Sequence, residues 1–153
     1  MSGYARLTRL PIPQKRPVRL SDCLRRVVAL ETQTQVTLQS GPDITIQADS
    51  DQLDQLLINV IRNAAEASAE TKGGVKVGWA QTNAYAEIWV EDDGPGLSNT
   101  ANLFVPFFTT KPKGTGIGLV LSRQIAEAHG GNLTLGNRVT SHGCIARLRL
   151  PVA

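Results

Sequence analysis

The clearest pattern of hydrophobic and polar positions predicts a long helix that starts near residue 50. Its apolar residues recur at intervals of three and four positions, which places them on one face of an α-helix. They are Leu53, Leu56, Leu57, Val60, Ile61 and Ala64. Asp49 followed by Gln52 resembles a capping box, so we expect the helix to begin directly after Asp49.

Two shorter helices are predicted, one on each side of the long helix in the sequence. Ser21 has the side chain of an N-cap and precedes a run of about ten residues with helical spacing. The apolar face of this run is formed by Leu24, Val27, Val28 and Ala29. Residues 118–129 form the other predicted helix, because Gly130 and Gly131 are typical of a helix C-terminus.

Short segments of alternating polarity predict strands. Residues 85–91 alternate in this way and follow residues 75–80 at the distance of a hairpin. The other predicted strands are 16–20, 36–38, 44–46, 133–135 and 145–150. Residues 92–116 are rich in glycine and proline and show no regular pattern. We therefore predict an α/β (α+β) fold, a two-layer sandwich of a mixed, mostly antiparallel sheet packed against about three helices.

The length and composition are those of one compact domain. A chain of 153 residues has room for one hydrophobic core of ordinary size. No segment approaches the ~20 apolar residues of a membrane span, and the basic, proline-broken start does not resemble a signal peptide. Pro11, Pro13 and Pro17 exclude a helix near the N-terminus. Residues 1–15 are therefore expected to be a connector, and residues 16–153 the folded domain.

Charge, cysteine and histidine positions carry little functional information. Cys23 and Cys144 lack the spacing of metal ligands and are expected to be small buried hydrophobes in a reducing compartment. The net charge of +3 comes without basic residues interleaved with aromatics, so it does not predict nucleic-acid binding. Neither His129 nor His142 has an acidic neighbour or a nucleophile pattern around it in sequence, and neither is expected to be catalytic. His129 is expected to cap the helix that it ends.

Two asparagines lie beside the apolar face of the long predicted helix. Asn59 and Asn63 are one helical turn apart, so their amides point the same way. An amide oxygen is a hard, neutral ligand that suits Mg²⁺ when the ion also holds phosphate oxygens. The alternative is that both amides bond to nearby backbone groups, and the pair alone does not decide between the two.

An acidic and glycine-rich segment follows the second strand of the predicted hairpin. Its residues are Glu91, Asp92, Asp93, Gly94, Pro95 and Gly96. A carboxylate at the end of a buried strand can accept a hydrogen bond from a ring amine, and glycine lets the backbone approach a flat ligand. The alternative is an ordinary acidic turn, because Asp-Gly and Pro-Gly both favour turns.

A second glycine-rich segment, residues 111–119, leads into the third predicted helix. Free backbone N–H groups at a helix N-terminus bind anions, and Lys111 and Lys113 add positive charge. The alternative is a flexible loop, since neither the dinucleotide-binding fingerprint nor a P-loop ending is present. Residues 102–111 hold all three phenylalanines of the chain, which indicates a loop pinned to the core or a lid over a ligand.

The order and spacing of these segments resemble the ATP-binding catalytic domain of sensor histidine kinases. This domain belongs to the superfamily of gyrase, the heat-shock chaperone ATPases and the mismatch-repair ATPases, which has the Bergerat fold. Residues 57–67 are similar to the N box, 92–96 to the first glycine box, 104–111 to the F box and 114–119 to the second glycine box. The Thr-Thr-Lys lid is most similar to that of the nitrogen-regulation type of sensor kinase.

The resemblance implies a role for each matching residue. Asn63 would be the Mg²⁺ ligand, Asn59 a catalytic contact to the phosphates, and Asp92 the acceptor for the exocyclic amine of adenine. Phe104 and Phe107 would hinge the lid. The other residues expected to bind ATP are Gly94, Gly96, Thr110, Lys111, Gly114, Thr115, Gly116, Gly118 and Leu119, with Lys111 as the second catalytic residue at the phosphates. Phosphoryl transfer needs mainly positioning and charge neutralisation, which this set supplies.

One position separates a kinase from the related ATPases. The chaperone and topoisomerase ATPases carry a glutamate four residues before the Mg²⁺ asparagine, where it acts as general base for water. Here that position is Asn59, which cannot accept a proton, and neither Glu66 nor Asp54 replaces it. The resemblance therefore favours a protein-histidine kinase over an enzyme that hydrolyses ATP.

The phosphoacceptor motif of such kinases is not found around either histidine. The resemblance implies that the acceptor lies on a separate or missing dimerisation domain, with residues 1–15 as the tail of the connection, and that a response regulator then takes the phosphate. It also implies a cytoplasmic domain, monomeric when isolated, without nucleic acid or direct membrane contact, although the parent sensor can be membrane-anchored. The alternatives are an anti-sigma-type serine kinase and a non-catalytic nucleotide-binding regulatory module.

Overall fold

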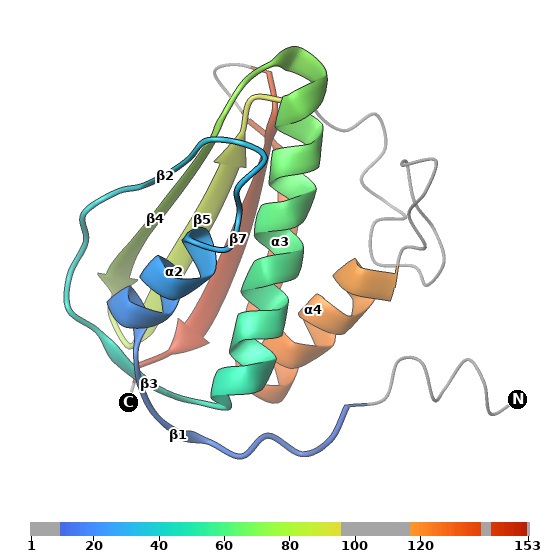
Figure 1. Ribbon diagram of the computed structural model, residues 1–153. Coiled ribbons are helices and arrows are strands. Elements are labelled where there is room, and N and C mark those ends of the chain that lie inside the picture. The colour runs from blue at the N-terminus through green and yellow to red at the C-terminus, as the bar shows by residue number, and fades with distance from the viewer. Residues whose placement is uncertain (1–9, 96–116, 139–141, 153) are drawn as a thin grey trace, which may run out of the picture.

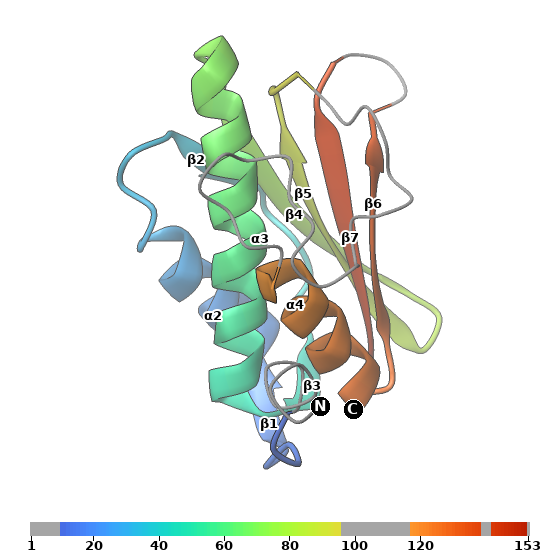
Figure 2. The ribbon, with the colours of Figure 1, turned by 90° about the vertical axis from the view of Figure 1, so that its right-hand side faces the viewer.

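The computed structural model describes residues 10–95, 117–138 and 142–152. Within these ranges, three helices cover one face of a five-stranded sheet. Figure 1 shows the helices in front of the strands, and Figure 2 shows both layers from the side. The two-layer sandwich predicted from the sequence is confirmed.

The five-stranded sheet has the strand order β2-β4-β5-β7-β6. Its strands are β2 (Val36–Leu38), β4 (Val75–Thr82), β5 (Tyr85–Asp92), β6 (Asn132–Asn137) and β7 (Cys144–Pro151). β2 pairs with β4 in parallel, and the other three pairs are antiparallel, including the predicted hairpin of β4 and β5. β1 (Arg16–Arg19) and β3 (Thr45–Ala48) form a separate antiparallel pair. The mixed, mostly antiparallel sheet is confirmed.

α3 (Ser50–Thr71) is the predicted long helix, and Asp49 is its N-cap. The carboxylate oxygen Oδ1 of Asp49 accepts hydrogen bonds from the backbone N–H groups of Asp51 and Gln52, both at 3.1 Å. The second half of the capping box is not formed. The Gln52 amide instead donates to the carbonyl of Pro11 at 3.0 Å, and the backbone N–H of Asp49 donates to His129.

α2 (Leu20–Val28) begins before the predicted cap. Ser21 lies inside the helix and is buried, so the prediction that it caps the helix is wrong. The N-cap is Arg19, which makes no side-chain capping bond, and the backbone N–H of Leu20 donates to the carbonyl of Ile44 at 2.9 Å. Ala29 is the exposed C-cap and does not belong to the apolar face. Packing against the β3 segment fixes this helix start.

α4 (Ile117–Ala128) ends at the predicted pair of glycines. Gly130 has a φ of +80°, which glycine adopts without strain, and the N–H of Gly131 donates to the carbonyl of Ala126 at 2.9 Å. His129 is buried between the end of α4 and the start of α3. Its Nε2 accepts the N–H of Asp49 at 3.0 Å, so its Nδ1 carries the proton and donates to the carbonyl of Ile125 at 2.8 Å. His129 therefore has a structural role, as expected.

The core lies between the helices and the sheet. Its largest fully buried side chains include Leu20, Leu24, Ile44, Ile46, Leu53, Leu56, Leu57, Ile61, Ile88 and Ile125. The segment before β1 also packs here, since the backbone N–H of Gln14 donates to Oδ2 of Asp49 at 2.9 Å and Leu10 contacts the core. No helix of the described ranges is long and apolar enough to cross a membrane.

Candidate functional site

Asp92 is the last residue of β5. Alternate residues of this strand face the helices and are buried, and Asp92 continues the series after Ile88 and Val90. The residue is 5% exposed. The strand alternation therefore takes a carboxylate out of water, and a buried carboxylate needs polar partners.

Backbone donors on two sides hold one oxygen of this carboxylate. Gly94 donates its N–H to Oδ1 of Asp92 at 2.9 Å, and Cys144 donates its N–H to the same oxygen at 3.1 Å. No donor from the described residues reaches Oδ2. Burial raises the pKa of Asp92, while the two backbone hydrogen bonds and Arg138 act in the opposite direction. Within the described part of the chain, the carboxylate is thus held at Oδ1 alone.

The turn after Asp92 packs directly on α3. A Cβ built on Gly94 would lie 2.8 Å from both Cβ and the carbonyl oxygen of Ala67, so a larger residue would push the turn away from the helix. The N–H of Asp93 donates to the Ser68 hydroxyl at 3.1 Å, and this hydroxyl donates to the carbonyl of Gly74 at 2.8 Å. Ser68 is fully buried and ties the turn to the end of α3.

Asn59 and Asn63 lie on the same side of α3 as Ala67, two turns and one turn before it, and both are half-buried. The helical rise places Asn59 about 12 Å from Ala67 along the axis. Gly118 in α4 lies against Asn59, since a Cβ built on it would be 3.7 Å from the side-chain carbon of Asn59. One side of α3 therefore meets α4 at one end and the turn after β5 at the other, with Asn63 between them.

The first turn of α4 adds a positive helix end to this site. Backbone N–H groups of a first turn have no partner within the helix, and they attract anions. Gly118 and Leu119, both half-buried, lie in this turn. Because Gly118 contacts Asn59, an anion at the start of α4 would lie beside the asparagine pair.

Eight of the predicted site residues lie outside the described ranges. They are Gly96, Phe104, Phe107, Thr110, Lys111, Gly114, Thr115 and Gly116. The predicted residues that the structure does bring together are Asn59, Asn63, Asp92, Gly94, Gly118 and Leu119. The Asp92 turn and the asparagine pair of α3 therefore both lie within the described ranges.

A metal ion at this site would depend on few protein ligands. Among the described residues, no group of three His, Cys, Asp or Glu side chains could hold a metal ion. Asn63 offers one neutral amide oxygen, a donor that hard divalent cations accept. This donor set fits Mg²⁺ only when oxygens of a bound phosphate complete its coordination, as in nucleotide sites.

The two cysteines are buried, as predicted, and take no part in the site as nucleophiles. Burial raises the pKa of Cys23 to about 12 and that of Cys144 to about 11. The Cys23 thiol donates to Oδ1 of Asp54 at 3.3 Å. Both thiols stay protonated at neutral pH, whereas nucleophilic attack and metal binding need the thiolate.

Ser68 and Arg138 contact the Asp92 segment, and neither was predicted as part of the site. Arg138 follows β6 and donates to the carbonyl of Asp92 and the carboxylate of Asp93. The sequence does contain one signal, because three successive acidic residues at a strand end need a cation nearby. It does not show which of the 16 lysines and arginines supplies that cation.

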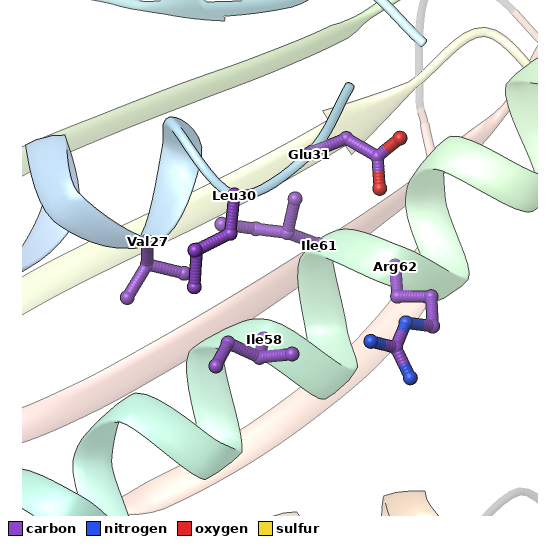
Figure 3. A pocket seen from close by; sticks show the side chains of 6 residues that line it. All are labelled: Val27, Leu30, Glu31, Ile58, Ile61 and Arg62. Atoms are coloured by element: carbon purple, nitrogen blue, oxygen red, sulfur yellow. The ribbon is translucent and has the colours of Figure 1, made fainter. Parts of the chain in front are cut away.

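A separate hollow lies between α2 and α3, as Figure 3 shows. It is lined by Val27, Leu30, Glu31, Ile58, Ile61 and Arg62. The Glu31 carboxylate is held by the backbone N–H groups of Gln33 and Thr34, at 2.9 and 3.1 Å. Successive helix residues turn by about 100°, so the lining positions of α3 face away from Asn59 and Asn63. This hollow is therefore not part of the candidate site.

Comparison with known sequences agrees with this geometry. The family model described as histidine kinase-, DNA gyrase B-, and HSP90-like ATPase matches residues 48–153. The sensor protein kinase PilS of Pseudomonas aeruginosa is 39% identical over 123 residues, which cover 75% of this chain and 23% of PilS. The sensor protein FixL of Bradyrhizobium diazoefficiens is 38% identical over 125 residues, 79% of this chain and 24% of FixL. The chain thus spans about a quarter of the length of these relatives.

Solved structures match over almost the whole chain. The nucleotide-free catalytic domain of histidine kinase ThkA superimposes with a TM-score of 0.78 at 28% identity, over 90% of this chain and 95% of that one. Full-length ShkA in complex with AMPPNP gives 0.84 at 28% identity, over 98% of this chain and 34% of that one. ThkA in complex with the response regulator TrrA gives 0.77 at 25% identity, over 92% of this chain and 42% of that one.

Proposed function

Because the chain belongs to the family of histidine kinase-, DNA gyrase B-, and HSP90-like ATPases, we propose that it is the ATP-binding catalytic domain of a sensor histidine kinase. It would transfer the γ-phosphoryl group of ATP to a histidine on a dimerisation domain outside this chain. The observation that carries the proposal is the arrangement of Asp92, a buried carboxylate fixed at one oxygen, at the end of the α3 face that holds Asn59 and Asn63.

Recognition of adenine is assigned to Asp92. Oδ2 accepts a hydrogen bond from the exocyclic amine of adenine, whereas guanine has a carbonyl oxygen at that position and would be repelled by the carboxylate. The N–H groups of Gly94 and Cys144 keep Oδ1 in place, so that Oδ2 keeps its direction. Gly94 also keeps the turn close to α3.

The phosphates are assigned to the other end of the α3 face. Mg²⁺, when bound, supplies positive charge to the phosphate oxygens, and Asn63 offers it an amide oxygen. Asn59 lies beside the start of α4 and contacts the phosphates together with Lys111, Thr110, Thr115 and the glycines of 114–118. An amide cannot take a proton from water, so Asn59 favours transfer to a protein acceptor over hydrolysis.

The partners are a dimerisation domain that carries the acceptor histidine and a response regulator that takes the phosphate. The complex of ThkA with the response regulator TrrA supports the second of these. ATP is available in the cytoplasm, so the domain is proposed to act there, by itself or as the cytoplasmic part of a membrane-anchored sensor. The isolated domain is proposed to be a monomer.

Calorimetric titration with ATP and Mg²⁺ tests the nucleotide site. We expect Asp92→Ala to weaken binding by at least about tenfold, since a hydrogen bond to a charged group contributes about 1.5–3 kcal/mol. Asn63→Ala should remove the Mg²⁺-dependent part of the affinity, and Asn132→Ala, an exposed asparagine at the far end of β6, should bind as wild type. Absence of binding by the wild type would contradict the proposal.

Incubation with radiolabelled ATP and candidate dimerisation domains tests the transfer. A label that is labile in acid and stable in base identifies phosphohistidine, the expected product. An acid-stable label would indicate a serine kinase of the anti-sigma type. Tight ATP binding without transfer to any candidate domain would favour a regulatory nucleotide-binding module.

A further inference from the structure

Arg138 contacts the strand end that carries Asp92 at three points. Its Nη1 donates to the backbone carbonyl of Asp92 at 3.2 Å and to Oδ1 of Asp93 at 2.7 Å. Its Nε lies 3.6 Å from Oε2 of Glu91. The Arg138 side chain is only 18% exposed, so these contacts are less screened by water than those of a surface ion pair.

The end of the β6–β7 hairpin holds this arginine in place. The backbone N–H of Arg138 donates to the carbonyl of Gly143 at 3.0 Å. Gly143 has a φ of +110°, and a Cβ at this position would overlap the carbonyl oxygen of Asp92. The next residue, Cys144, donates its N–H to the Asp92 carboxylate. The end of the β6–β7 hairpin therefore contacts both the backbone carbonyl and the side chain of Asp92.

Acidic groups otherwise dominate the surroundings of Asp92. Among the described residues, the charged and titratable groups here are Glu91, Asp93, Arg138, the thiol of Cys144 and, through its effect on Asp93, Lys76. The α3 residues that contact this turn, Ala67, Ser68 and Thr71, carry no charge. The Cys144 thiol is protonated at neutral pH because burial raises its pKa to about 11. Arg138 thus supplies a positive charge in direct contact with three successive acidic residues.

We infer that Arg138 is a positioning residue for base recognition, which fixes the direction of the Asp92 carboxylate and keeps it able to accept a hydrogen bond from an amine-bearing base. The inference rests on the proposed ATP site. It assigns a role in nucleotide selectivity to a residue outside the four sequence boxes.

Two effects of Arg138 act on Asp92. The guanidinium binds the Asp92 carbonyl and the Asp93 carboxylate together, so the chain around Asp92 cannot rotate without breaking both contacts. Its charge also lowers the pKa of Asp92 against the effect of burial. A protonated Asp92 would present an O–H donor to an adenine amine, which is itself a donor, and the hydrogen bond would be lost.

The test is titration of ATP with Mg²⁺ between pH 5.5 and 8, using Arg138→Gln and Arg138→Lys. Arg138→Gln should weaken binding about three- to tenfold. It should also move the acidic loss of affinity to higher pH, because the positive charge that lowers the pKa of Asp92 is removed. Arg138→Lys keeps the charge but not the planar fork, so it should leave that pH unchanged and restore only part of the affinity. Arg147→Gln, the same change at an exposed arginine of β7, should bind as wild type at every pH.

The possible failures can be told apart. If the wild type does not bind ATP, the proposed function fails, and carbon NMR titration of the Asp92 carboxyl without nucleotide still tests Arg138. An Asp92 titration that is the same in Arg138→Gln and wild type would overturn the inference. Wild-type ATP affinity of a folded Arg138→Gln at every pH would overturn it as well. If Arg138→Gln does not fold, full wild-type affinity of Arg138→Lys has the same consequence.

Discussion

Asp49 and Asp92 are both buried residues, 9% and 5% exposed, but their environments shift their pKa values in opposite directions. Both oxygens of Asp49 accept backbone hydrogen bonds, two at Oδ1 and one, from Gln14, at Oδ2. These bonds lower the pKa of Asp49, the bond from Gln14 most. Asp92 receives two bonds from the described residues, both at Oδ1, and burial raises its pKa. Burial has the largest effect on the pKa of Asp92, whereas backbone hydrogen bonds have the largest effect on that of Asp49.

The two aspartates also lie at opposite ends of α3. Asp49 caps the start of the helix, where the helix dipole favours negative charge. Asp92 ends β5 beside the last turns of the helix, where its turn contacts Ala67 (Figure 1). Asp49, with both oxygens occupied, stabilises the start of the helix, whereas the proposed role of Asp92 is to bind the nucleotide base. Four variants or conditions test this contrast, in order of decreasing expected effect.

Substitution of Gly143, which packs against the backbone carbonyl of Asp92, should lower the unfolding free energy most. Gly143→Ala places a Cβ against the Asp92 carbonyl at a positive φ, and we expect a loss of about 2–4 kcal/mol in unfolding free energy. Urea unfolding measures this. Gly136→Ala is the matched control on β6, since a Cβ there meets nothing within 4 Å, and it should cost less than about 1 kcal/mol. Equal costs for the two variants would contradict the tight packing at Asp92.

Removal of the cap should affect stability but not the nucleotide. Asp49→Ala should lower the unfolding free energy by about 1–2 kcal/mol, because three backbone donors lose their acceptor. The folded variant should bind ATP as wild type does. Asp51→Ala, an exposed acid in the same turn, should cost less than about 1 kcal/mol. A large loss of ATP affinity in Asp49→Ala would contradict the claim that Asp49 serves stability alone.

Neutralisation of Asp92 should raise the unfolding free energy, whereas removal of the Asp49 cap lowers it. The raised pKa of Asp92 means that its ionised form is disfavoured by folding at neutral pH. Asp92→Asn keeps an oxygen for the two backbone donors, and we expect it to raise the unfolding free energy by about 0.5–1 kcal/mol while weakening ATP binding. Urea unfolding at pH 7 provides the measurement. A clear loss of stability there would show that the charge of Asp92 stabilises the fold.

The pH dependence of the unfolding free energy should also differ between the two aspartates, and here the expected effects are the smallest. The lowered pKa of Asp49 gives a contribution that is complete above the ordinary value of 3.8 and is lost as the pH falls through the folded pKa. The stability advantage of wild type over Asp49→Asn should therefore shrink in acid. The deficit of wild type relative to Asp92→Asn should also shrink as the pH falls through the raised pKa of Asp92. Differences that stay constant from pH 7 to pH 3 would contradict both assignments.

Local patterns predicted the elements that local interactions determine. The apolar face and the Asp49 cap of α3, the β4–β5 hairpin and the glycine end of α4 all depend on residues close in sequence. The start of α2 was not predictable in this way. It depends on the hydrogen bond from Leu20 to the Ile44 carbonyl, a contact between residues 24 positions apart. The side-chain cap that Ser21 suggested is not needed there.

In the candidate site too, some residues could be predicted from the sequence and others depend on tertiary contacts. The order of the motifs indicated Asp92, Gly94 and the asparagine pair, because their chemistry is visible in the residue types. The parts played by Ser68 and Arg138 come from tertiary contacts, namely the packing of the β5 turn on α3 and the register of β6 with β7. No sequence pattern distinguishes Arg138 from the other basic residues, so its place beside Asp92 required the structure.

Base selectivity of wild type and Asp92→Asn tests the central claim most directly. Inosine triphosphate differs from ATP at the base position proposed to contact Asp92, where it has a carbonyl oxygen in place of the amine. Calorimetric titration should show that wild type prefers ATP by at least about tenfold. Asp92→Asn, whose amide can also donate a hydrogen bond, should lose or reverse this preference. Equal binding of both nucleotides by wild type, or an unchanged preference in Asp92→Asn, would contradict the assignment of Asp92 to the base.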